Sequence, residues 1–353
     1  MSGQVRSAIR RALPSETFAP RPLRALLIPL WATVSAALIG TIIFAGLPWW
    51  ADLGLGLALG WSFAGGGFVA HEVLHGSTVK NRLLQDVLGW VGFLPFLVSP
   101  SLWREWHNRR HHTHANQGIR DPDAFGDVKH YVEGGPRRAS LGLLPGSGTL
   151  RSFFFFGYWF TFHNLMILLV MSRRFRGFNR APALIHTAIA AVFWGGVIAL
   201  AGWESLFAVF LPMMLGNAMV MGYIATNHML RPEARDGDVV ETTMSVRVPW
   251  IVDVLHGNFS HHIEHHLFPA MNPSQAPAVK AWLEEHGEEA YLAPPLFTAI
   301  AWLYRTPRPY KDHRTLVHPD RPEHTVDLDA MAEVLREASG PRPGKRGKRD
   351  RAA

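Results

Sequence analysis

Histidine is concentrated in three short segments of this chain. They are HEVLH at 71–75, HNRRHHTH at 107–114 and HHIEHH at 261–266. Imidazole is the commonest metal ligand among protein side chains, and so dense a set of imidazoles is hard to account for by structural hydrogen bonds alone. The three segments therefore predict one metal site that is assembled from distant parts of the chain.

The first histidine segment follows directly on an apolar stretch. His71 and His75 are four residues apart, so both rings would lie on one face of a helix and could bind the same metal or neighbouring metals. Taken alone, the pair could equally be the polar end of a helix. HEVLH also matches the HExxH pattern of zinc peptidases, in which Glu72 would be the general base.

The second segment holds four histidines in eight residues. His107 and His111 are again four apart, and His112 would point sideways to another metal or partner. His114 is interpreted as lying outside the ligand set and donating to a carboxylate such as Asp121 or Asp123, because ligand rings are usually oriented by such outer contacts.

The third segment precedes a proline. His262, His265 and His266 have the spacing i, i+3, i+4, which places all three on one helical face, and Pro269 would end that helix soon afterwards. His261 would point elsewhere and is interpreted as a bystander.

A single histidine completes the set of nine. His228 follows the last long apolar run and is either a ninth ligand or a hydrogen-bonded interfacial histidine. Eight or nine imidazoles exceed what one ion can accept, so a centre with two metals is implied, and neutral nitrogen ligands with few carboxylates suit iron. The chain has no cysteine, which excludes thiolate zinc sites and iron–sulfur clusters.

Composition indicates a membrane protein, because 48% of the residues are hydrophobic and only 18% are charged. Apolar runs of about 20 residues are long enough to cross a bilayer core. Such runs occupy 25–47, 52–70, 152–171, 183–201 and 205–226, with a shorter one at 87–100.

The flanking charges predict the topology. The arginine-rich start places the N-terminus in the cytoplasm. The run 87–100 is broken by Pro95 and Pro100 and should dip into the interface, and the run 152–171 has arginines at both ends and is expected to be interfacial or re-entrant. We therefore expect an all-α membrane protein with four transmembrane helices, interfacial helices and a cytoplasmic histidine-rich cap, with both termini inside.

Four regions follow from this topology. They are a basic cytoplasmic N-terminus at 1–24, a transmembrane catalytic domain at 25–275, a cytoplasmic C-terminal cap at 276–339 with helices near 275–286 and 326–338, and a disordered basic tail at 340–353. The net charge of +7 comes largely from the two ends. Beside transmembrane segments, these basic ends indicate anionic lipid headgroups as the partner and not nucleic acid.

The three segments resemble the three histidine boxes of the membrane fatty acid desaturase superfamily, and HHIEHHLFP is most similar to the third box of its acyl-lipid branch. The resemblance covers about residues 60–275. It implies a four-span helical fold and a cytoplasmic di-iron centre. The ligands that it implies are His71, His75, His107, His111, His112, His262, His265 and His266, with His228 where some members place an additional ligand.

Two features depart from the commonest pattern of this family. The second box has one more residue between its first and second histidines, and His262 stands where this branch often has glutamine. Both departures bear on the branch of the family to which the chain belongs and on the position in the acyl chain that reacts. Neither affects metal binding.

The resemblance also implies the reaction. The expected enzyme is an oxidoreductase that acts on paired donors, reduces O₂ to water and introduces a double bond into an acyl chain carried by a lipid, coenzyme A or a carrier protein. The chain has no flavin or nicotinamide fingerprint and no cysteine, so electrons would come from a separate donor such as ferredoxin. The expected location is a bacterial plasma membrane, with the active site in the cytoplasm.

Three other readings of the histidines remain. A membrane hydroxylase or ketolase of alkyl chains or carotenoids would use the same boxes. An intramembrane HExxH zinc peptidase would leave two of the three segments unused and lacks a Leu-Asp-Gly segment for its third ligand. A metal transporter is disfavoured because the histidines gather on one side of the membrane and do not line a path through its middle.

Overall fold

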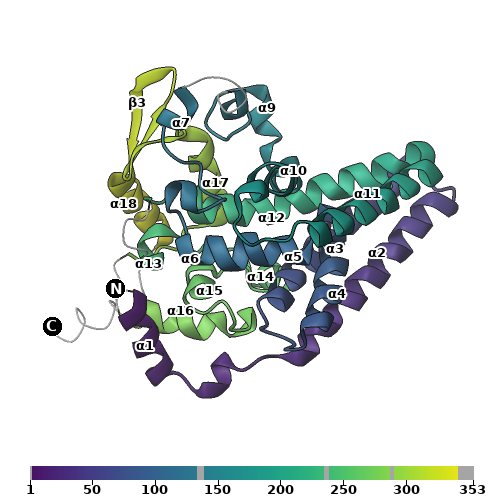
Figure 1. The fold of residues 1–353 in the computed structure, drawn as a ribbon, viewed down its shortest axis with the longest axis horizontal. Coiled ribbons are helices and arrows are strands. Elements are labelled where there is room, and N and C mark those ends of the chain that lie inside the picture. Colours follow the sequence, from purple (N-terminus) through teal and green to yellow (C-terminus); the bar gives the residue numbers. More distant parts are fainter. Residues whose placement is uncertain (1, 133–138, 234–237, 287–289, 341–353) are drawn as a thin grey trace, which may run out of the picture. The chain divides into compact units, whose positions relative to one another are not determined.

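The computed structural model describes residues 2–132, 139–233, 238–286 and 290–340 (Figure 1). Apart from Gly340, the basic tail expected at 340–353 lies outside the described residues. The chain separates into two compact units. The membrane unit contains Pro20–Arg109 and Phe156–Met221, and the sheet unit contains Met1–Ala19, Arg110–Phe155 and Gly222–Ala353.

The membrane unit consists of helices joined by loops and contains no strand among its described residues. Its long elements are α2 (Leu27–Phe44), α3 (Trp49–Leu74), α4 (Arg82–Phe93), most of α10 (Phe155–Leu169), α11 (Ala181–Ala201) and the first part of α12 (Leu211–Met229). Its shorter elements are η2 (Pro22–Leu26), η3 (Leu94–Phe96), α5 (Pro100–Trp103), the π-helix η4 (Arg104–His111), η6 (Met171–Arg174), η7 (Gly202–Glu204) and the π-helix η8 (Leu206–Phe210).

Five helical segments of the described chain are long and apolar enough to cross a membrane. They are Ser15–Phe44, Trp49–Leu74, Phe155–Arg174, Ala181–Glu204 and Leu206–Met229. These segments confirm that all five long apolar runs of the sequence are helical. The segment 155–174 meets the same criteria as the other four, so an interfacial placement for it, and with it the count of four crossings, stays a prediction.

The short run 87–100 forms a sharp bend. The helical segments Arg82–Phe96 and Pro100–His114 meet at 97°, the geometry of a broken span or a re-entrant loop. Proline at 95 and 100 interrupts the backbone hydrogen bonds of a continuous helix there. The two prolines identified in the sequence therefore account for the bend.

Side chains from two helices satisfy the exposed backbone of this bend. Asn164 of α10 and Thr187 of α11 both donate to the carbonyl of Leu97, at 3.0 and 3.1 Å, and Trp194 donates to the carbonyl of Leu94 at 2.9 Å. Irregular backbone at membrane depth is tolerated only where protein groups satisfy its hydrogen bonds. These three donors therefore allow the chain to turn between apolar helices.

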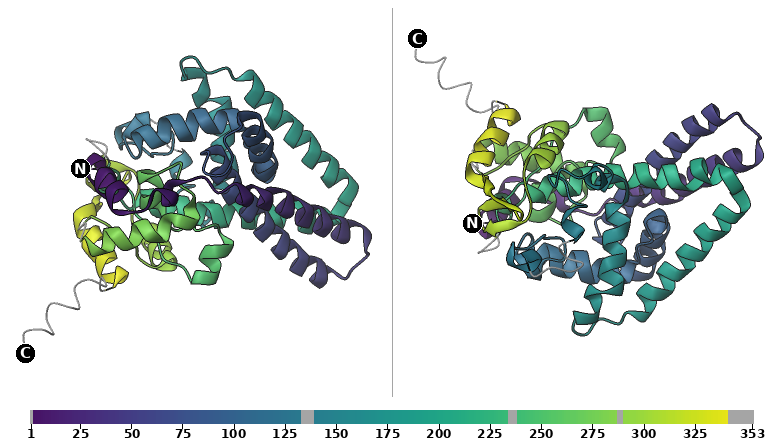
Figure 2. Two further views of the ribbon diagram at one scale, coloured as in Figure 1. Left: turned by 90° about the horizontal axis from the view of Figure 1, so that it is seen from below. Right: turned by 90° about the horizontal axis from the view of Figure 1, so that it is seen from above.

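The most enclosed span of the membrane unit is α3, which runs beside α2 (Figures 1 and 2). In its most apolar stretch 67% of the residues are buried, against 11% for Ser15–Phe44. Glycines allow this close packing, since a Cβ on Gly60 would lie 2.8 Å from Leu215 and one on Gly65 would lie 2.7 Å from Trp31. The helix that ends in HEVLH is thus held tightly by its neighbours.

The sheet unit combines short helices with one small sheet. Its helices are α1 (Ser2–Ala12), η1 (Ser15–Phe18), α6 (His112–His114), η5 (Gly118–Arg120), α7 (Lys129–Val132), α9 (Leu150–Phe153), α13 (Val239–Thr242), α14 (Trp250–Leu255), α15 (His262–Leu267), η9 (Pro273–Gln275), α16 (Ala276–Glu285), α17 (Leu296–Arg305) and α18 (Leu328–Ser339). The helices expected near 275–286 and 326–338 are confirmed as α16 and α18.

The antiparallel sheet has the order β1–β2–β3 and was not predicted. Its strands are β1 (Tyr310–Asp312), β2 (Thr315–His318) and β3 (Arg321–Asp327). The strands are short, and β3 is polar and largely exposed, so the sequence lacks the alternation of apolar and polar residues that indicates a half-buried strand.

The N-terminal helix packs against the helix of the third histidine segment. On α1, Val5 and Ile9 are buried in one apolar cluster with Ile263 and Leu267 of α15. Helices stabilise a fold mainly through such a buried apolar face. The start of the chain is therefore part of the core that supports α15.

Two arginines of α1 strengthen this contact. Arg10 lies 5.3 Å from the ring centre of Phe18 and 5.6 Å from that of Phe268, distances typical of cation–π contacts. Arg6 donates to the backbone carbonyl of His266 at 3.3 Å. These two cations of the basic N-terminus thus contact the third histidine segment.

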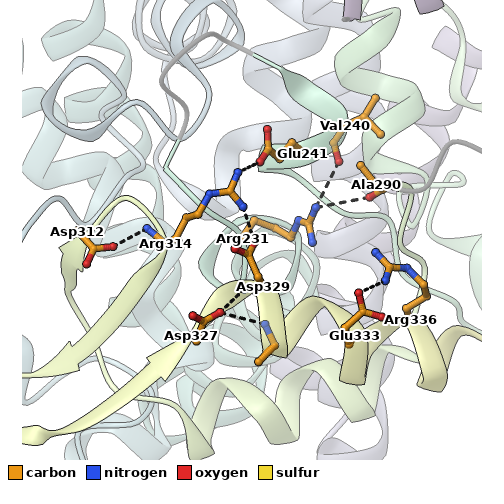
Figure 3. Close-up of polar contacts among 11 residues, drawn as sticks. Arg231, Val240, Glu241, Ala290, Asp312, Arg314, Asp327, Asp329, Glu333 and Arg336 are labelled. Atoms are coloured by element: carbon orange, nitrogen blue, oxygen red, sulfur yellow. Dashed lines mark hydrogen bonds and ion pairs between the residues drawn. The ribbon is translucent and has the colours of Figure 1, made fainter.

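Ion pairs connect α13, the β1–β2 turn and α18 (Figure 3). Arg314 pairs with Glu241 of α13 and with Asp329 of α18, and the side chain of Asp327 caps α18 by accepting from two of its first backbone amides. Pairs this exposed contribute little free energy. Their effect is to fix the register of these elements.

Replacing Ile9 with alanine tests the support that α1 gives to α15. Because the Ile9 side chain is fully buried, we expect Ile9→Ala to lower the free energy of unfolding by about 2–5 kcal/mol. Thermal unfolding in detergent would measure the effect. Gln4→Ala, on the exposed face of α1, is the control. Equal midpoints for the two variants would show that α1 does not support the core.

Candidate metal centre

The nine histidines expected as ligands lie in two clusters, three of them in the membrane unit and six in the sheet unit. In the membrane unit, His71, His75 and His107 each place a ring nitrogen within 4.8 Å of the others. The Nε2 atoms of His71 and His107 are 3.1 Å apart. His71 and His107 are buried and His75 is partly buried, so this cluster is well shielded from solvent.

Two helical geometries bring these three rings together. His71 and His75 are one turn apart at the end of α3, as their spacing predicts. His107 lies in the π-helix η4, whose hydrogen bonds join residues five apart where an α-helix joins residues four apart. The wider turn provides a place for the extra residue between the first two histidines of the second segment.

An indole ring holds His107 in place. Trp103 stacks on the His107 ring with a centroid distance of 4.1 Å and an interplanar angle of 23°, and its edge meets the His71 ring at 5.6 Å. Buried aromatic contacts of this kind restrict ring rotation. The cluster therefore has its orientation set before any ligand binds.

Glu72, inside HEVLH, is fully occupied by a salt bridge. Its carboxylate accepts from Arg24 at 2.6 and 2.9 Å, and the side chain is almost completely buried. A carboxylate held by both oxygens in a guanidinium fork is a strong structural anchor. It fixes the first histidine segment to η2 and is poorly suited to act as a general base.

The second cluster belongs to the sheet unit. His111, His228, His262 and His266 are all buried, and each places a ring nitrogen within 4.8 Å of the others. His228 lies at the end of α12 and His262 begins α15, and their Nε2 atoms are 2.6 Å apart. This cluster therefore brings together histidines from three separate parts of the chain, the second histidine segment, the end of α12 and the third histidine segment.

Two more histidines lie at the edge of this cluster. The Nε2 atoms of His112 and His265 are 3.1 Å apart, and the His112 ring centre is 4.4 Å from that of His266. All six predicted ligands of the sheet unit thus form one contiguous group of rings.

A carboxylate orients His111. Its Nδ1 donates to Asp121, 3.0 Å from each oxygen, and lies 3.3 Å from Asp123. Asp121 also accepts from the backbone amide of Asn116 at 2.7 Å. The expectation that His114 makes this contact is wrong, because His111 occupies the carboxylate and His114 Nδ1 instead faces the side-chain oxygen of Gln117 at 3.2 Å.

A second buried carboxylate anchors α15. Glu264 is fully buried and accepts from Ser245 at 2.6 Å and from Tyr291 at 2.7 Å. His261 lies 3.5 Å from Glu264 and 3.3 Å from Asp253. Burial alone would lower the pKa of His261, but hydrogen bonds to the two carboxylates outweigh it and raise that pKa to about 9. His261 is thus a charged partner of the anchor and is not among the clustered rings.

The other histidines of α15 are held in the neutral form. Burial lowers the pKa of His265 to about 3, and burial together with neighbouring imidazoles lowers the pKa values of His262 and His266 well below 6.5. Neutral imidazole is the form that binds metal. The electrostatics therefore favour ligation at this helix.

His266 has two buried ring nitrogens with no hydrogen-bond partner among the described residues. Leaving a buried polar group unsatisfied costs about 1–3 kcal/mol. A metal ion bound to the ring would remove part of this cost. The donor set of neutral nitrogens with a few nearby carboxylates fits a transition metal such as iron.

Sequence reasoning named Asp121 as an orienting carboxylate of the second segment, but it did not find the groups that anchor the first and third segments. Arg24 and Glu72 are 48 positions apart, and nothing in their spacing connects them. The sequence around Glu264 gives a weak indication of an anchor, because an acidic residue between clustered histidines needs a hydrogen-bonding or charged partner once it is buried. Its partners Ser245 and Tyr291 lack any such signal.

Removing Arg24 tests the anchor of the first segment. Arg24→Ala leaves the Glu72 carboxylate buried without its cation, which should cost about 3 kcal/mol, the low end for a buried pair because Arg24 is partly exposed. Thermal unfolding would report the loss. Arg21→Ala, an exposed neighbour, should have almost no effect. Similar midpoints for the two variants would contradict the assignment.

Asp121→Asn tests the orienting contact to His111. The amide keeps the size of the side chain but removes the charge that aligns the ring, so we expect metal affinity to fall by about 10–100-fold. Titration of the metal-stripped protein with Fe²⁺, followed by elemental analysis, would measure it. Asp312→Asn, at an exposed position, is the control and should bind like the parent protein. An unchanged affinity in Asp121→Asn would show that the contact is only structural.

Comparison with known proteins places these features in one family. The family model described as "Fatty acid desaturase" matches residues 47–295, which is more than half of the chain and includes all nine clustered histidines. The omega-6 fatty acid desaturase of the chloroplast from Spinacia oleracea is 27% identical over 305 residues, 80% of this chain and 64% of the relative.

Two further relatives have similar identities. The corresponding protein from Arabidopsis thaliana is 26% identical over 347 residues, 92% of this chain and 71% of the relative. An acyl-lipid (7-3)-desaturase from Rebecca salina is 26% identical over 298 residues, 69% of this chain and 61% of the relative. The chain thus spans just under two thirds of the spinach protein. From the extent of the family match we conclude that this chain belongs to the fatty acid desaturase family.

Proposed function

We propose that this protein is an O₂-dependent di-iron desaturase that introduces a double bond into an acyl chain. The observation that carries the proposal is the convergence of nine imidazoles in two clusters. Removal of hydrogen from an unactivated methylene pair needs an oxidant stronger than any side chain, and bound iron with O₂ would supply it.

Each cluster would hold one iron ion. In the membrane unit the ligands would be His71, His75 and His107. In the sheet unit they would be His111, His228, His262 and His266, with His112 and His265 as further ligands. The π-helix Arg104–His111 carries one proposed ligand of each cluster, His107 and His111, so the chain itself connects the two sites.

Neighbouring residues would orient these ligands and exclude water from them. Trp103 holds the His107 ring, and Asp121 keeps a proton on Nδ1 of His111, so that Nε2 would be the metal-binding nitrogen of that ring. The negative charge of Glu264 and the positive charge of protonated His261 neutralise each other beside the ligands of α15. Burial of these groups excludes water, which strengthens each electrostatic contact.

The proposed substrate is an acyl chain carried by a lipid, coenzyme A or a carrier protein. Two observations support it: the apolar helices place the protein where acyl chains are, and relatives are named omega-6 and acyl-lipid desaturases. A separate protein such as ferredoxin would supply electrons. The proposed location is a bacterial plasma membrane, with the active site and both termini on the cytoplasmic side. The arginines before the first candidate span support this orientation.

The geometry argues against a zinc peptidase. Such an enzyme needs Glu72 as a general base within reach of a metal-bound water. Here both oxygens of Glu72 are engaged by Arg24. A hydroxylase or ketolase would use the same clusters, and the reaction product distinguishes it from a desaturase.

Expression in a bacterial host that lacks desaturases tests the proposal. We expect new double bonds in the total fatty acids, measured by mass spectrometry, and two irons per purified chain. His75→Ala and His266→Ala, one from each cluster, should abolish product and lower the iron content. His286→Ala, at an exposed position, is the control.

Other results would point elsewhere. Hydroxylated or oxygenated products with two irons would favour the hydroxylase or ketolase. One tightly bound zinc with no lipid product would contradict both oxidative functions. Comparing the lipid, coenzyme A and carrier-protein fractions would identify which form carries the new double bond.

A further inference from the structure

The short helix α14 exposes one apolar face. Trp250 is 75% exposed, Ile251 54% and Val254 57%, and these positions share a face because of the i, i+4 spacing of Trp250 and Val254. Asp253, the one polar residue of this helix, is partly buried and contacts His261. The exposed residues of the helix are thus all apolar.

The start of α17 extends this apolar surface. Backbone hydrogen bonds join Arg247 to Pro294 and Leu296, so α17 begins beside the segment that leads into α14. Phe297, in the first turn of α17, is 81% exposed. Two large aromatic side chains, Trp250 and Phe297, thus lie unburied on neighbouring elements.

The helix α9 adds two exposed apolar side chains to this surface. Tyr304 of α17 donates to the carbonyls of Ser152 and Phe153 at 3.1 and 3.3 Å, which places α9 beside the last turn of α17. Leu150 is 79% and Phe153 69% exposed. Two residues after Phe153 the candidate span Phe155–Arg174 begins. The apolar surface is therefore continuous along the chain with a membrane helix.

Arginines border the apolar side chains. Arg151, Arg247 and Arg305 are exposed on α9, before α14 and at the end of α17. The guanidinium of Arg305 lies 5.6 Å from the ring centre of Trp302. Tryptophan and phenylalanine with adjacent arginine are typical of the layer where hydrocarbon meets lipid headgroups.

We propose that Leu150, Phe153, Trp250, Ile251, Val254 and Phe297 form a docking face that lies in the headgroup layer of a phospholipid bilayer. The apolar side chains enter the upper acyl region, and the bordering arginines contact phosphate groups. A bilayer is the occupant because a candidate span follows α9 directly in the sequence and the border of the face is cationic. The sheet unit is thereby attached to the membrane by a surface of its own.

The absence of cysteine in the chain allows a direct test. Trp250→Cys, Phe297→Cys and Phe153→Cys would each carry the only thiol, to which a nitroxide is attached. The full-length protein is reconstituted in phosphatidylcholine–phosphatidylglycerol vesicles. Electron paramagnetic resonance then compares the collision of each label with O₂, which concentrates in hydrocarbon, and with chromium oxalate, which stays in water.

The matched control is Val334→Cys on α18, where a valine is 37% exposed outside the docking face. We expect the ratio of O₂ to chromium oxalate accessibility to be several-fold higher at 153, 250 and 297 than at 334. Ile251→Cys, on the same face as Trp250, repeats the measurement if Trp250→Cys does not assemble.

Two outcomes would overturn the proposal. Ratios at 153, 250 and 297 equal to that at 334 would mean that the face is in water. Exclusion of both reagents would mean that a second copy or another protein covers it. Neither outcome involves iron or catalysis, so the docking face and the proposed function are tested independently.

Discussion

The structure depends on one constraint, which is that many imidazole rings are buried together. Burial lowers the pKa values of His262, His265 and His266, whereas at His111 burial is outweighed by the Asp121 carboxylate, which raises that pKa to about 9. Such rings offer lone pairs that cannot all be satisfied by donors from one another, as the unsatisfied nitrogens of His266 show. The surrounding fold must therefore fix each ring by other means. Close glycine packing holds α3, the stacked Trp103 holds His107, and the packing of α1 supports α15.

Each histidine segment also has a buried carboxylate with a cationic or imidazole partner. Glu72 pairs with Arg24 at the first segment, Asp121 with His111 at the second and Glu264 with His261 at the third. Removing a charge from water is costly unless it is paired and hydrogen-bonded, so each carboxylate fixes its partner in one place. The three carboxylate contacts thus fix each histidine segment separately, so that the positions of the rings do not rest on one helix alone.

Much of the architecture followed from local patterns. The five apolar runs are helices because their length and hydropathy leave no other solution in a bilayer, and His71 and His75 meet because a helical turn brings them together. The small sheet joins strands that are adjacent in the chain, and it was missed because β3 is polar and largely exposed. The contact of α1 with α15 and the pairing of Arg24 with Glu72 join residues far apart in the chain. Such contacts are decided by tertiary packing, which neither spacing nor composition encodes.

The π-helix Arg104–His111 has an evolutionary consequence. A π turn arises most simply when one amino acid is inserted into an existing α-helix, and the surplus is absorbed as a local widening while both flanks keep their phase. A single inserted residue would therefore account for the longer spacing of the second histidine box, because the π-helix accommodates it locally while His107 and His111 each stay within their clusters.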